Sequence, residues 1–118
     1  MKPTTIKTNI AKVLKEKGGE NVRTMDITKK TTVTDFFVIA TGKNPAHVAA
    51  LANDVMEKME AKKIYPSRQE GISEGKWAIL DFDAVIVHIF NAETRDFYCL
   101  ETLWKKQIHM DKAVLEEL

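Results

Sequence analysis

Two short apolar runs separated by a single acidic residue constrain this chain more than any other feature. The runs are Trp77–Phe82 and Ala84–Phe90, and only Asp83 lies between them. Valine, isoleucine and phenylalanine suit a pleated surface, and each run is too short for an independent helix. The pattern therefore predicts two buried strands that pair through a tight turn at Asp83.

His88 lies in the middle of the second run. Strand alternation predicts that its side chain shares a face with Ile86 and Phe90. As a general base it would need a nucleophile or an orienting acid. Three acids are candidates for the orienting role: Asp35, Asp81 and Glu101. A hydrogen-bonded, partly buried histidine is the simpler interpretation, and we favour it.

Periodicity and capping residues outside the hairpin predict the remaining elements. Helices are expected over Thr4–Lys17 (capped by Thr4 or Thr5 and closed by Gly18–Gly19), Pro45–Ala61 (capped by Asn44) and Ala92–Lys106. Strands are expected over Val22–Thr28, Thr34–Thr41 and Tyr65–Glu70, with Val22 out of phase with the rest of its strand. This order predicts one α/β domain over residues 1–118, a mixed sheet of about five strands with flanking helices. Residues 107–118 are expected to form a short tail helix or a flexible tail.

Composition excludes several functional classes. The net charge is +1, without the basic stripe of a protein that depends on phosphate contacts. No apolar run approaches the roughly 20 residues of a membrane span, and the N-terminus lacks a signal-peptide core. The single cysteine, Cys99, excludes an internal disulfide and multi-cysteine zinc patterns. We expect a cytoplasmic protein that binds no membrane, metal or cofactor. If it works near nucleic acid, we expect a protein partner to hold it there.

Two sites with possible chemistry have simpler structural interpretations. Asp81 and Asp83 are two residues apart and could bind a divalent metal, as in nucleotidyl transfer. However, Gly42-Lys43-Asn44 stands where such an enzyme would carry Gly-Ser. We favour Asp83 as the turn residue and Asp81 as a structural acceptor. The loop Ala40–His47 could receive an anion at a helix N-terminus, but capping that helix is the simpler role.

Trp77 follows a polar, glycine-containing loop and Trp104 precedes Lys105–Lys106. Each tryptophan suits either a core position or a protein-interface anchor, since tryptophan is enriched among interface hot spots. The residues alone leave these alternatives open.

Several motifs, taken together, resemble the ribosomal silencing factor family (RsfS, or Iojap) over about residues 22–106. The motifs are Thr34–Gly42, His47-Val48, Glu70-Gly71, Trp77, Val87–Phe90, Arg95–Tyr98 and Leu100–Trp104. Where the family has Asp-Tyr-Gly-Asp-Val, this chain has Asp81-Phe82-Asp83-Ala84-Val85. Asp83 thus replaces a glycine, which predicts a turn conformation that aspartate tolerates.

The resemblance implies a nucleotidyltransferase-like sheet without the active site, and therefore a protein that is not an enzyme. It implies binding to a large-subunit ribosomal protein at the intersubunit face, so that the small subunit cannot join and translation falls when nutrients are scarce. A contribution to late subunit assembly is implied as well. The resemblance also implies a homodimer when free and little direct contact with nucleic acid. The expected partner-binding residues are Trp77, Ile79, Glu70, Gly71, Tyr98, Asp81 and Glu101. A residual metal-dependent nucleotidyltransferase and a generic homodimeric adaptor are the alternatives.

Overall fold

The computed structural model describes residues 2–29, 32 and 34–92 and contains two helices and five strands there. The helices are α1 (Pro3–Glu16) and α2 (Pro45–Glu60). The strands are β1 (Glu20–Asp26), β2 (Phe36–Gly42), β3 (Arg68–Glu70), β4 (Trp77–Asp81) and β5 (Val85–Asn91). These elements confirm the predicted order, with boundaries that differ by a few residues. The helix predicted over Ala92–Lys106 and the predicted 107–118 tail lie almost entirely outside the described residues.

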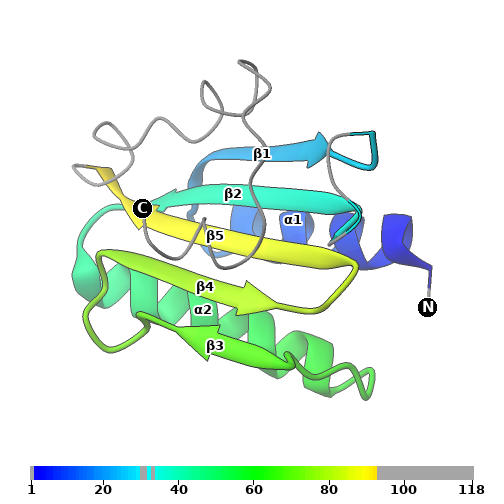
Figure 1. Ribbon diagram of the computed structural model, residues 1–118. Coiled ribbons are helices and arrows are strands. Elements are labelled where there is room, and N and C mark those ends of the chain that lie inside the picture. Colours follow the sequence, from blue (N-terminus) through cyan, green and yellow to red (C-terminus); the bar gives the residue numbers. More distant parts are fainter. Residues whose placement is uncertain (1, 30–31, 33, 93–118) are drawn as a thin grey trace.

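The five strands form one mixed sheet in the order β1-β2-β5-β4-β3 (Figure 1). The central pair, β2 and β5, is parallel, and the other three pairs are antiparallel. β2 and β3 therefore run in the same direction on either side of β5 and β4. This agrees with the prediction that α2 makes a crossover connection between them.

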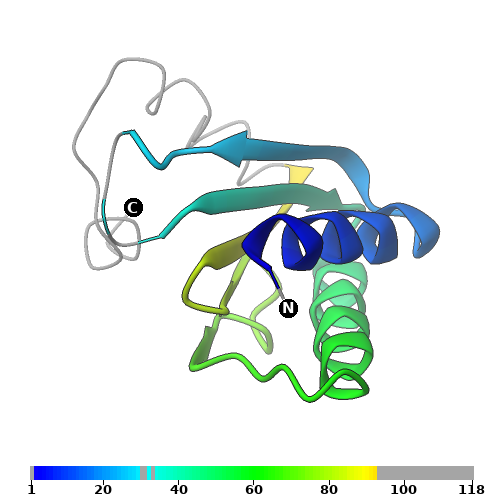
Figure 2. The same ribbon diagram turned by 90° about the vertical axis from the view of Figure 1, so that its right-hand side faces the viewer.

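Both helices pack on the same face of this sheet (Figure 2). The core beneath them joins buried side chains of α1 and α2, such as Leu14 and Leu51, with alternate residues of the central strands, such as Val38 and Val87. The opposite face carries a second apolar cluster: Ile27, Phe37, Ile39, Ile79, Ile86 and Phe90, with Met25 and Trp77 partly buried beside them. We call this side the second face of the sheet.

The N-terminal cap of α1 differs from the prediction, whereas its C-terminal end does not. Its N-cap is Lys2, which makes no side-chain cap, and Pro3 occupies the first turn. Neither Thr4 nor Thr5 is the cap, because Pro3 starts the helix earlier with its φ already fixed. The C-terminal prediction is correct: Gly18 has φ +85°. The Gly18 and Gly19 amides donate to the carbonyls of Lys15 and Leu14, which closes the helix in a Schellman motif.

Val22 lies on the face of β1 opposite to Met25 and Ile27. It packs against the helix-side core, while Met25 packs on the second face, as ordinary alternation places residues three positions apart. A bulge shifts the register at the start of the strand: Glu20 pairs with Thr41 and Arg23 with Ile39, so three steps along β1 oppose two along β2, and Asn21 has φ +48° there.

The hairpin turn forms as predicted. Asp83 has φ +67°, in the left-handed region, and its amide donates to Asp81 Oδ1 at 2.8 Å. The Phe82 amide closes the turn onto the Val85 carbonyl at 2.9 Å. Aspartate thus serves here because it tolerates the left-handed region better than most side chains.

Candidate functional site

Strand register gathers most of the predicted binding residues on the second face of the sheet. Trp77, Ile79 and Asp81 alternate along β4, opposite Phe90, His88 and Ile86 of β5. On the other side of β4, Glu70 pairs with Ile79 and Arg68 pairs with Asp81. Directly opposed residues of antiparallel strands share a face, so one face at the β3-β4-β5 end of the sheet carries them all.

Trp77 is partly exposed and lies at one end of this group, as the first residue of β4. Its indole stacks on Phe90, with ring centroids 5.1 Å apart and planes inclined by 26°. Its Nε1–H donates to His88 Nδ1 at 3.0 Å. The indole thus packs on the sheet, as the core interpretation requires, while part of the side chain reaches the surface; its role as an interface anchor stays a prediction.

His88 is almost completely buried, with 1% of its surface exposed. Its ring makes an edge-on contact with Phe37 at 4.8 Å. Burial lowers the pKa of His88 to about 3, although the nearby Asp81 carboxylate opposes that shift. The imidazole is therefore neutral at physiological pH. Since Nδ1 accepts the indole proton, the ring's own proton is on Nε2.

The Nε2 group of His88 makes no hydrogen bond in the part of the chain that the structure describes. The predicted face of His88 is correct, but the ring is fully buried and only one of its two nitrogens is satisfied. A buried unsatisfied donor costs stability. This arrangement fits a structural group that holds Trp77 better than it fits a general base.

Gly71 is required by the backbone beside Trp77. It has φ +72°, and a Cβ placed on it would lie 2.0 Å from the Trp77 carbonyl oxygen. Only glycine allows this approach, so the Glu70-Gly71 motif shapes the turn that presents Trp77. We therefore expect Gly71 to act through Trp77.

The acidic candidates differ in accessibility. Glu70 is exposed, and its Oε1 accepts a 2.9 Å hydrogen bond from the Arg68 guanidinium, with which it forms an ion pair. Arg68 is not among the predicted binding residues. Asp81 is only 3% exposed. Its Oδ1 accepts the Asp83 amide, as the structural interpretation predicted, while Asp83 Oδ1 accepts from Ser67 Oγ. Ile79 is likewise buried. Tyr98, Cys99, Glu101 and Trp104 lie outside the described residues.

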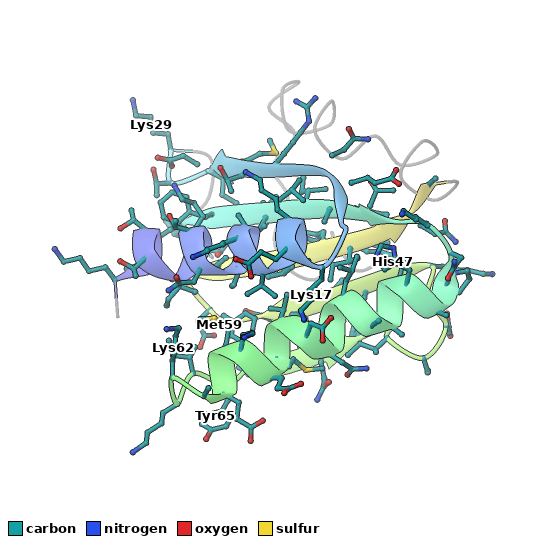
Figure 3. All side chains as sticks on the ribbon, turned by 180° about the vertical axis from the view of Figure 1, so that it is seen from behind. Lys17, Lys29, His47, Met59, Lys62 and Tyr65 are labelled. Carbon is teal, nitrogen blue, oxygen red and sulfur yellow. The ribbon has the colours of Figure 1, made fainter. Side chains whose placement is uncertain are left out.

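The loop before α2 uses its polar groups internally. Asn44 Oδ1 accepts the His47 amide at 2.9 Å, which confirms the predicted cap. His47 Nδ1 accepts the Lys43 amide at 2.9 Å, so its Nε2–H donates to the Lys17 carbonyl at 3.1 Å. His47 thereby connects the start of α2 to the end of α1 (Figure 3). These bonds support the capping role predicted for the loop.

The described residues contain neither a cluster of metal ligands nor a membrane-spanning helix. No three histidine, cysteine, aspartate or glutamate side chains there are grouped so that they could hold a metal ion. No helix in the same part of the chain has the length and apolar content needed to cross a membrane.

Comparison with known proteins identifies the family. Residues 2–118 match the family model described as "Ribosomal silencing factor during starvation". The chain belongs to the ribosomal silencing factor family. This family comprises ribosome-associated regulators and not enzymes, as the sequence motifs implied.

Bacterial relatives of the family are similar over most of this silencing factor's length. The Zymomonas mobilis ribosomal silencing factor is 34% identical over 82% of this chain and 73% of its own. The Bacillus subtilis factor is 30% identical, over 75% of each chain. A more distant mouse relative, 24% identical, is named "Mitochondrial assembly of ribosomal large subunit protein 1", and this chain covers 43% of it.

Solved structures have the same fold. A crystal structure of a Chromobacterium violaceum protein superposes with a TM-score of 0.86 at 30% identity, covering 89% of this chain and 88% of that one. A Bacillus halodurans protein superposes with a TM-score of 0.73 at 28% identity, covering 86% and 91%. The predicted α/β architecture is thus confirmed for the family as well as for this chain.

Proposed function

We propose that this silencing factor binds a protein of the large ribosomal subunit through the accessible part of the second face, where Trp77 and Glu70 reach the surface, with Trp77 as the anchor. The bound factor occupies the intersubunit side, so that the small subunit cannot join and translation falls when nutrients are limiting. The observation that carries this proposal is the geometry of Trp77, a partly exposed indole held against a rigid sheet by Phe90 and His88.

Central, well-packed aromatic side chains supply most of the energy of many protein interfaces. Trp77 has the features of such an anchor, because its packing fixes its orientation before a partner arrives. Glu70 lies beside it on the sheet and gives the rim of the contact a carboxylate. Ile79 and Asp81 support this surface from within the sheet, and Gly71 shapes the turn behind it. Tyr98 and Glu101 complete the proposed binding set by their positions in the family motifs.

The near-neutral charge favours a protein partner over extensive contact with ribosomal RNA. We therefore propose that binding depends weakly on salt, in contrast to a protein that neutralises many phosphates. The same proposal places the factor in the cytoplasm and makes it a homodimer when it is not bound to the ribosome. Equilibrium sedimentation of the free protein would detect the dimer.

The test is sucrose-gradient sedimentation of the purified protein with isolated large subunits, followed by addition of small subunits. Wild-type protein should migrate with large subunits and reduce the fraction of joined particles. Trp77→Ala should bind at least about thirtyfold more weakly, the effect of losing a hot-spot aromatic worth about 2 kcal/mol. Tyr65→Ala is a matched control, since Tyr65 is 62% exposed and precedes the other end of β3. A folded Trp77→Ala protein that migrates like wild type would refute the proposed anchor.

A role in large-subunit assembly is a second candidate. The observation that favours it is the name of the mouse relative, which refers to assembly of the mitochondrial large subunit. Cells that lack the factor would then accumulate incomplete large-subunit particles during exponential growth, when silencing is not needed. Normal particle profiles in those cells would exclude this second role.

A further inference from the structure

We propose that His88 is a positioning residue for docking: it fixes the Trp77 indole in the orientation that the partner recognises. The proposal rests on the docking role of Trp77 proposed above and adds the group that prepares Trp77 for it. His88 itself is buried and does not meet the partner.

His88 is itself held in place. Its ring lies against Phe37 at 4.8 Å with an interplanar angle of 73°, and parallel to Phe90 at 6.2 Å. Phe37 and Phe90 are both completely buried. A ring packed in this way keeps one rotamer, and its Nδ1 lone pair keeps one direction.

The Nδ1 lone pair of His88 in turn constrains Trp77. The Nε1–H···Nδ1 bond of 3.0 Å joins residues on adjacent strands, while Phe90 supports the indole by stacking at 5.1 Å. Stacking alone allows a ring to slide or turn in its own plane. A directional hydrogen bond at one edge removes that freedom, so the two contacts together fix the side chain.

The sheet loses stability through this arrangement. Because Nδ1 accepts from Trp77, the remaining ring proton is on Nε2, which is buried and makes no hydrogen bond within the described part of the chain. An apolar side chain of similar size would avoid this unsatisfied group. A purely structural role would therefore be served better by leucine than by histidine.

Two substitutions of His88 distinguish core packing from positioning of Trp77. His88→Leu removes the acceptor, whereas His88→Asn keeps an acceptor oxygen near the position of Nδ1. Affinity for isolated large subunits and urea unfolding should be measured for both variants and wild type at neutral pH. His88→Leu should be at least as stable as wild type but should bind about three- to tenfold more weakly, because Trp77 must then lose rotamer freedom on docking. His88→Asn should bind more tightly than His88→Leu despite being less stable.

Equal affinity of wild type and folded His88→Leu would overturn the positioning role. If wild type binds and Trp77→Ala does not, that result would leave the docking role of Trp77 intact. If wild type itself does not bind large subunits, the proposed function fails, and the two failures are thereby distinguished. Nitrogen-15 relaxation of the Trp77 indole in free wild-type protein provides a test that needs no folded His88 variant. An order parameter of about 0.85 for the indole N–H, the value of rigid backbone, supports the proposal. A value typical of a mobile side chain contradicts it.

Discussion

The carbonyl oxygen of Trp77 lies where a side chain at position 71 would begin, 2.0 Å from an ideal Cβ on Gly71. This relationship joins the turn after β3 to the first residue of β4, and it sets where the backbone of Trp77 enters the sheet. The conformation of one glycine and the position of the proposed anchor are therefore coupled.

Gly71→Ala should destabilise the protein by at least about 2 kcal/mol, from left-handed backbone strain together with the steric overlap. Gly18→Ala is the matched control, because Gly18 has a similar φ of +85° but its Cβ would meet nothing closer than 3.7 Å. That variant should lose only about 1 kcal/mol. Urea unfolding measures both, and equal losses would show that the approach to Trp77 is unimportant.

Replacing Asp83 tests the turn. Asp83→Gly should change the free energy of unfolding by less than about 0.5 kcal/mol, since relief of the φ +67° conformation offsets loss of the Ser67 hydrogen bond. Asp83→Val should cost about 1–2 kcal/mol, because a β-branched residue is poorly tolerated in the left-handed region. Thermal unfolding of the two variants checks the order. A valine variant as stable as the glycine variant would contradict this description of the turn.

Removing the His47 ring should weaken the connection between the two helices. His47→Ala loses the bonds to the Lys43 amide and the Lys17 carbonyl, and we expect a loss of about 1–3 kcal/mol. Asn53→Ala, an exposed position on the same helix, should change stability by less than about 0.5 kcal/mol. Denaturant titration compares them, and a His47→Ala protein as stable as Asn53→Ala would exclude the connecting role.

The buried His88 makes stability depend on pH. Its pKa is about 3 in the folded protein against 6.5 in the unfolded chain, so between these values the unfolded state holds more protons. The contribution of neutral His88 to the free energy of unfolding is complete above about pH 6.5 and is lost as the pH falls toward 3. Between about pH 7 and pH 5, wild type should lose about 2 kcal/mol more than His88→Leu. Parallel stability profiles for the two proteins would contradict a neutral buried histidine.

Local patterns were sufficient to predict much of the fold. The hairpin follows from two β-type runs with one residue between them, and α2 follows from Asn44-Pro45 and its periodic apolar positions. Capping at α1 was predicted wrongly, because Pro3 can begin a helix without a side-chain cap. The bulge between Glu20 and Arg23 was not predicted, since its geometry depends on pairing with β2.

The site was predictable in part for the same reason. Once the turn is centred on Asp83, the register places Trp77 opposite Phe90, and the shared face of Trp77 and His88 follows from alternation. The Trp77–His88 hydrogen bond was missed because it runs diagonally between strands and depends on side-chain rotamers. The Arg68–Glu70 pair was missed because both residues lie in a strand of only three residues.

The most direct test of the central claim is the rate at which small subunits join large subunits, followed by light scattering after mixing. Large subunits pre-incubated with wild-type protein should join slowly, and those pre-incubated with Tyr65→Ala should join equally slowly. Trp77→Ala at the same concentration should restore the rate seen without any factor. If a folded Trp77→Ala protein inhibits joining as strongly as wild type, Trp77 is not the docking anchor. If wild type does not slow joining at all, the anti-association function is wrong.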